Sequence, residues 1–87
     1  MPTMAQFNHG WSGKGNDQMQ LTLQEEQEAD GRWLAEVVEL PGVLAYGPTI
    51  EEARAHAQAL ALRVLADQLE QGERDAQWTT ITFAPAA

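Results

Sequence analysis

The stretch that decides the fold is Asp30 to Ala53, which reads DGRWLAEVVELPGVLAYGPTIEEA. The pair Asp30-Gly31 stands between two extended runs and predicts a tight hairpin turn in which both residues take positive φ. The pair Pro41-Gly42 predicts a second turn, because proline presets φ at about −65° and glycine supplies the positive φ that follows. Thr49, with Glu52 three residues later, predicts a capped helix start.

The sequence around this stretch completes the order β-β-β-α-β. Residues 18–27 alternate apolar and polar side chains, which predicts a half-buried strand. Residues 32–39 and 43–46 are the next predicted strands, and residues 50–69 carry the apolar stripe of an amphipathic helix. Residues 77–83, rich in threonine and aromatic side chains, predict a last strand. We therefore expect an α+β fold: an antiparallel three-stranded meander plus a fourth strand, with one long helix packed on one face.

Two further features concern the position of the second strand in the sheet and the ends of the helix and of the fold. The second strand has apolar side chains on both faces: Trp33, Ala35 and Val37 on one, and Leu34 and Val38 on the other. A strand of this kind usually lies at the centre of a sheet with both faces covered. Gly72 predicts the end of the helix, and Pro85 with the terminal alanines predicts the end of the fold.

Length and composition bound the possible functions. The chain has 87 residues, enough for one domain, and 13 acidic residues against 5 basic ones give a net charge of −8. Such a surface repels phosphate, so we expect no direct binding of nucleic acid. It favours a basic protein partner, although simple solubility is an alternative role. Since a small domain without cysteine lacks a disulfide staple, we expect a homo-oligomer, a dimer or tetramer, with a well-packed monomer as the alternative.

The N-terminal residues 1–17 are rich in glycine and asparagine and have no apolar period, which predicts a flexible tail before a folded domain at residues 18–87. No apolar run reaches the roughly 18 residues that a membrane span needs. The N-terminus also lacks the charged and apolar regions of a secretory signal. We therefore expect a cytoplasmic protein that does not associate with membranes.

No motif predicts catalysis, a cofactor or a metal site. Gly13-Lys14-Gly15 lacks the spacing and the Ser/Thr of a phosphate-binding loop. His56 has Glu52 as a helix-face neighbour, whereas zinc takes three or four ligands. Glu36 and Glu39 differ by an odd number, so a regular strand directs them to opposite faces. We expect a protein that is not an enzyme and holds no cofactor.

Aromatic side chains on the predicted strands are candidates for a contact surface. They pack into the core in most proteins, but tryptophan and tyrosine are also enriched at the centres of interfaces. The predicted contact surface consists of Trp33, Glu36, Val38, Tyr46 and Trp78.

The segment from Asp30 to Ala53 resembles the HicB-like antitoxin family. The resemblance lies in Asp30-Gly31, Trp33, Ala35-Glu36-Val37, Glu39, Leu40-Pro41-Gly42 and Thr49-Ile50-Glu51-Glu52-Ala53. It implies a reduced relative of the ribonuclease H fold that is usually dimeric or higher. It also implies a partner, a small basic HicA-type toxin that cleaves mRNA and is neutralised when the antitoxin covers its active site.

The chain departs from this family at its C-terminal end. Many members carry a helix-turn-helix or ribbon-helix-helix segment that binds their operator, whereas only Ala84 to Ala87 follow Phe83 here. The chain therefore resembles a stand-alone member without a DNA-binding domain. The alternatives are an orphan oligomeric module that binds another protein or a small ligand, and a residual magnesium-dependent enzyme related to ribonuclease H.

Overall fold

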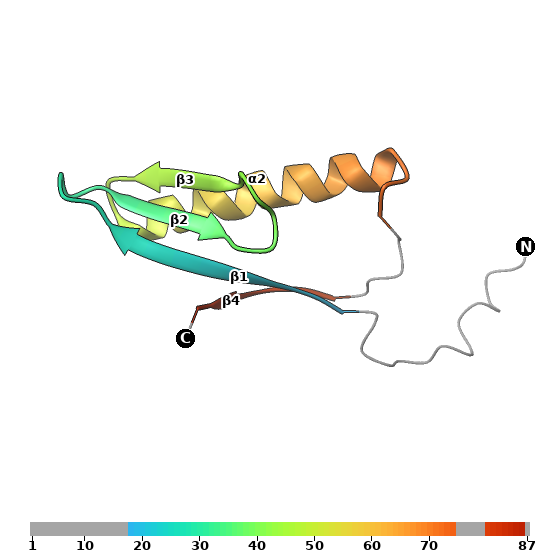
Figure 1. The fold of residues 1–87 in the computed structure, drawn as a ribbon, viewed down its shortest axis with the longest axis horizontal. Helices are drawn as coiled ribbons and strands as arrows, with labels where there is room; N and C mark the ends of the chain where they lie inside the picture. Colours follow the sequence, from blue (N-terminus) through green and yellow to red (C-terminus); the bar gives the residue numbers. More distant parts are fainter. Residues whose placement is uncertain (1–17, 75–79, 87) are drawn as a thin grey trace, which may run out of the picture.

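A sheet with one helix on one face makes up the part of the chain that the computed structural model describes, residues 18–74 and 80–86 (Figure 1). The elements are β1 (Gln18–Gln27), β2 (Trp33–Val37), β3 (Leu44–Gly47), α2 (Ile50–Glu70) and β4 (Thr80–Pro85). The four strands form one sheet in the order β3-β2-β1-β4. The predicted α+β class and the β-β-β-α-β order are therefore confirmed. The predicted tail at residues 1–17 lies outside the described residues.

The long strand β1 joins two different neighbours. Its C-terminal half pairs antiparallel with β2, from Leu23 opposite Val37 to Gln27 opposite Trp33. Its N-terminal half pairs parallel with β4, from Gln18 beside Thr80 onward. A parallel neighbour requires a long crossover connection, and α2 lies in that connection. The staggered pairing places β4 beside one end of β1, away from β3.

The last strand runs two residues further than the sequence predicts. β4 covers Thr80–Pro85, and the predicted residues 77–79 lie outside the described part of the chain. The strand ends at Pro85, which pairs with Leu23, and the Ala86 N–H that follows donates to the Leu23 carbonyl at 2.8 Å. Proline is tolerated on an edge strand where its missing N–H would point away from the neighbour. Pro85 therefore stands at the end of the last strand, as predicted.

Small side chains bring α2 close to the sheet. Ala53, Ala57 and Ala61 are fully buried at successive turns of the helix, and they face β2 and β3. The predicted alternation of β1 is confirmed, since Leu21 and Leu23 are buried on the same side. The core therefore lies between α2 and one face of the sheet.

The first hairpin turn differs from the prediction. Among the described residues only glycines have positive φ, so Asp30 does not adopt it, whereas Gly31 has a φ of 92°. The Gly31 N–H donates to the Glu28 carbonyl at 2.9 Å, and the Glu28 N–H donates to the Arg32 carbonyl at 2.7 Å. This pattern fits a three-residue loop in which one left-handed glycine follows an ordinary turn. One longer loop therefore replaces the predicted two-residue turn.

The remaining boundaries follow the sequence. Gly42 has a φ of 88°, and the Val43 N–H donates to the Leu40 carbonyl at 3.0 Å, as the predicted second turn requires. The Thr49 hydroxyl accepts a 3.1 Å hydrogen bond from the Glu52 N–H at the helix start. At the other end Gly72 has a φ of 76°, its N–H donates to the Leu69 carbonyl, and the next N–H, of Glu73, donates to the Gln68 carbonyl. Both helix ends are therefore confirmed.

The prediction that both faces of the second strand are covered was wrong. β2 is an interior strand of the sheet, but α2 covers only the face that contains Ala35 and Val37. No described helix or strand lies over the opposite face (Figure 1). A single helix layer buries only one face of a sheet. The other face is therefore left uncovered by the described helix and strands.

Candidate interaction surface

We call the side of the sheet that faces away from α2 the open face. Residues paired across neighbouring strands place their side chains on the same face, so the strand register assigns its members. One row across the sheet contains Gln24, Glu36 and Leu44, and the next contains Glu26, Leu34 and Tyr46. In each row β3 contributes an apolar side chain, and a strand further across the sheet contributes a carboxylate, Glu36 on β2 or Glu26 on β1. The open face therefore has an apolar side toward β3 and an acidic side toward β1.

The apolar side of the open face is accessible to solvent. The exposed fractions are 39% for Leu44, 41% for Tyr46 and 47% for Val38, which directly follows β2. Leu34 between them is half-buried. Neighbouring apolar groups that stay exposed on a small domain are typical of a contact surface.

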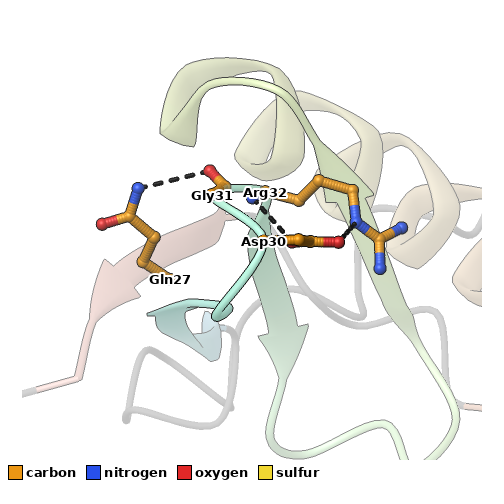
Figure 2. A network of polar contacts seen from close by, with 4 residues as sticks. All are labelled: Gln27, Asp30, Gly31 and Arg32. Atoms are coloured by element: carbon orange, nitrogen blue, oxygen red, sulfur yellow. Dashed lines mark hydrogen bonds and ion pairs between the residues drawn. The ribbon is translucent and has the colours of Figure 1, made fainter.

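Arg32 connects this apolar side to the first hairpin turn. Its guanidinium carbon lies 4.4 Å from the centroid of the Tyr46 ring, which is within the range of a cation–π contact. Its Nε lies 2.9 Å from Asp30 Oδ2, and its backbone N–H donates to Asp30 Oδ1 at 3.0 Å (Figure 2). Gln27 Nε2 also donates to the Gly31 carbonyl at 3.2 Å. The turn therefore holds the arginine over the tyrosine.

Hydrogen bonding keeps the Asp30 side chain ionised. The backbone N–H of Arg32, followed by its side chain and its charge, holds the pKa of the Asp30 carboxyl below its ordinary value. The positive charge of Arg32 is thereby compensated locally. By contrast, neither Glu26 nor Glu36 has an ion-pair partner within residues 18–74 and 80–86. The acidic side of the open face therefore offers two uncompensated carboxylates.

A third carboxylate closes the strand ladder beside this face. Glu39 accepts hydrogen bonds from the Thr22 N–H and the Thr22 hydroxyl, both at 2.7 Å. These bonds lower the pKa of the Glu39 carboxyl, the backbone N–H having the larger effect. The neighbouring Val38 N–H donates to the Thr22 carbonyl at 3.0 Å. Glu39 thus takes the place of a strand carbonyl where β2 ends, and its role is structural.

The helix side of the sheet contains a different polar feature. Arg54 on α2 binds Glu25 on β1 through two contacts, Nε to Oε2 at 2.6 Å and Nη2 to Oε1 at 3.1 Å. The Glu25 side chain is only 16% exposed, and its hydrogen bonds and charge raise the pKa of Arg54. The pair borders a cavity of about 290 Å³ that Leu23, Phe83 and Pro85 also line. Because the two charges neutralise each other, this cavity presents no free charge to a ligand.

A second cavity, of about 260 Å³, lies between the Leu40-Pro41-Gly42 turn and the C-terminal half of α2. Both volumes fall just below the range of roughly 300–1,000 Å³ that is usual for small-molecule pockets. The open face is therefore the stronger candidate for a functional surface.

The structure separates the residues of the predicted contact surface. Glu36 and Tyr46 lie in adjacent rows of the open face, and Val38 follows on the same strand. Trp33 lies on the opposite face, half-buried and packed against the core. Trp78 lies outside the described residues. The contact role of each of these residues stays a prediction.

Sequence reasoning missed Arg32 and Leu44 as members of this surface. Leu44 stands two residues before Tyr46, so simple alternation along β3 predicts that they share a face. The position of Arg32 over the ring has no comparable signal, because it depends on the pairing of Leu34 with Tyr46.

Two general properties of the described residues complete this account. No three His, Asp or Glu side chains within residues 18–74 and 80–86 are grouped so that they could hold a metal ion. In the same ranges, no helix combines the length and the apolar character that crossing a membrane requires. Comparison with protein-family models, with curated proteins and with solved structures returned no match for this chain.

Proposed function

We propose that the chain is a non-enzymatic protein-binding module, which acts like a HicB-type antitoxin and neutralises a small basic HicA-type toxin that cleaves mRNA. One observation supports this proposal above all. The open face combines exposed apolar side chains with two carboxylates that lack ion-pair partners among the described residues. The motif resemblance between Asp30 and Ala53 supplies the toxin as the partner.

Charge and burial act at different stages of the proposed binding. The net charge of −8 attracts a basic protein at long range and raises the rate of encounter. After contact, Leu44, Tyr46 and Val38 bury apolar area, while Glu26 and Glu36 pair with basic groups of the toxin. An RNA-cleaving site that attracts phosphate is basic, so the same carboxylates compete with its substrate.

The remaining parts of the proposal follow from this role. A protein that neutralises an mRNA-cleaving toxin works where the toxin works, so we place it in the cytoplasm, as a dimer or tetramer. The acidic surface gives it no direct contact with nucleic acid.

The test is co-expression with the small basic protein encoded beside the gene. The chain is expected to relieve toxicity, and the double variant Glu26→Lys/Glu36→Lys is expected to lose both relief and binding. The matched control is Glu70→Lys/Glu73→Lys, which changes the net charge equally at exposed positions near the end of α2. Absence of a basic neighbour, or equal loss in both variants, contradicts the proposal.

The second candidate is an orphan oligomeric module that binds another protein or a small ligand. The two cavities of about 290 and 260 Å³ favour the ligand version. Native mass spectrometry of protein purified from its own host tests it. A retained small molecule that is lost in an Arg54→Leu variant supports this candidate, and ligand-free protein of the expected mass contradicts it.

A further inference from the structure

The outer edge of β4 is a second surface of interest. β4 lies at the end of the sheet, and no described strand pairs with its outer side. Thr80, Ile81 and Thr82 are exposed, with 41% of Ile81 accessible to solvent. The sequence has no charged side chain after Asp75, although the chain as a whole has a net charge of −8. This edge is therefore an uncharged stretch of an acidic protein.

The backbone groups that this edge offers follow from one hydrogen bond. The Ala86 N–H points toward β1, where it donates to the Leu23 carbonyl. Because the N–H and C=O groups of successive strand residues alternate in direction, those of Ile81 and Phe83 point outward. The backbone of Pro85 also faces outward, so the N–H that proline lacks would have pointed to the free side and not to β1. The N–H groups of Ile81 and Phe83 and the carbonyls of Ile81, Phe83 and Pro85 thus remain available for a new strand.

Exposed strand edges in monomeric proteins are usually protected. Charged side chains, prolines, bulges or very short strands prevent pairing with other chains. β4 has six residues, and among these devices it has only Pro85 near its end. An edge with strand-forming side chains and no charge is a site where another strand adds.

We infer that this edge pairs with β4 of a second copy, antiparallel across a two-fold axis. Ile81 exchanges two hydrogen bonds with the partner's Phe83, and Phe83 exchanges two with the partner's Ile81. Thr82 then faces the partner's Thr82 across the axis. The two sheets become one continuous sheet of eight strands, since each copy contributes four. A two-fold axis requires this kind of reciprocal contact.

Charge selects a second copy as the occupant. Two chains that each have a net charge of −8 repel each other, so self-association needs a contact without charged side chains. A basic partner gains no electrostatic attraction from the same uncharged edge. On the helix side Met19 and Ile81 are neighbours, and the new pairing extends their apolar row toward the partner's Phe83. The inference rests on the proposed function in one respect, since the β4 edge is the contact that forms the oligomer proposed there. Toxin binding takes place on the open face and is measured separately.

The native chain has no cysteine, so single substitutions test the register directly. Under mild oxidation Thr82→Cys is expected to form a disulfide-linked dimer, because opposed residues in a non-hydrogen-bonded pair have Cα atoms about 4.5 Å apart. Thr80→Cys is the control, since in this register it lies about 14 Å from its counterpart, four residues away at about 3.4 Å each. Equal cross-linking of both variants, or none for Thr82→Cys, overturns the inference.

Light scattering coupled to size exclusion measures the second consequence. The native chain is expected at about twice its mass of 9.6 kDa, and Ile81→Lys at the monomer mass with an unchanged circular dichroism spectrum. Leu62→Lys is the matched control, because Leu62 is 46% exposed on α2, away from this edge. This variant is expected to stay dimeric. A native monomer, or dissociation by both variants alike, overturns the inference. Loss of toxin binding by Glu26→Lys/Glu36→Lys without loss of the dimer separates the two proposals.

Discussion

Gly47 is the position where one added methyl group tests the packing of the helix on the sheet. A Cβ at this position would lie 2.6 Å from the Ala53 backbone nitrogen and 3.1 Å from the Ala53 Cα. Carbon atoms normally approach other heavy atoms to about 3.5–4.0 Å. The contacted atoms belong to the first turn of α2, so no side chain can rotate to relieve the clash. We therefore expect Gly47→Ala to push the helix start away from β3.

The expected cost follows from the size of this displacement. The helix start has to retreat by nearly 1 Å, and overpacking of this kind costs about 1–3 kcal/mol. Gly47 does not have positive φ, so alanine accepts its backbone conformation. Without the clash, the substitution would stabilise the fold by about 0.4–1 kcal/mol, because alanine restricts the unfolded chain more than glycine. The sign of the effect therefore decides whether the close contact exists.

Urea unfolding monitored by circular dichroism measures this effect. With a slope of about 1–1.5 kcal/mol per molar urea for a domain of this size, the midpoint is expected to fall by roughly 0.7–3 M. Adding Ala53→Gly is expected to give no rescue, since the clash involves backbone atoms. A neutral or stabilised Gly47→Ala variant, or full rescue by Ala53→Gly, refutes the reasoning.

Three further predictions concern stability in urea unfolding. Thr49→Ala removes the hydrogen bond to the first turn of α2 and is expected to cost about 1 kcal/mol; an unchanged midpoint contradicts the cap. Ala57→Leu overfills a fully buried site and is expected to cost about 1–3 kcal/mol, whereas the exposed control Ala66→Leu stays within about 0.5 kcal/mol; equal effects contradict the packing. The carboxyl pKa values of Asp30 and Glu39 lie below their ordinary values of 3.8 and 4.5, so the stability they contribute is complete above those values and is lost as pH falls through the lower folded pKa. Unfolding measured from about pH 6 to pH 3 is expected to show this loss below about pH 4.5, with a shallower slope for Glu39→Gln; an identical slope in that variant contradicts the hydrogen-bonded carboxylate.

The candidate surface was only partly predictable from sequence. Alternation along one strand places Glu36 and Val38 on the face opposite Ala35, and the structure agrees. The sequence did not show that Trp33 lies on the other face, because an aromatic side chain suits a core and an interface equally well. The turn between β2 and β3 sets the register of the two strands. In that register Tyr46 pairs with Leu34 and lies on the open face.

The turns and helix ends were also only partly predictable from sequence. Pro41-Gly42, Thr49 and Gly72 were predicted correctly, because each acts on its own backbone or on residues a few positions away. Asp30-Gly31 was assigned the wrong turn, since the pair suits both a two-residue turn and a longer loop that ends in glycine. The choice between them depends on the strand register on either side.

The sequence by itself determined the order of the elements, the helix ends and the second turn, because these depend on local conformational preferences and on the period of apolar side chains. Only the tertiary structure decided that β4 lies parallel beside β1, that α2 covers one face and leaves the other open, and that Gly47 meets the helix start. Contacts between distant segments cause these features. A local pattern reports which face of a strand is apolar, but it does not report what covers that face.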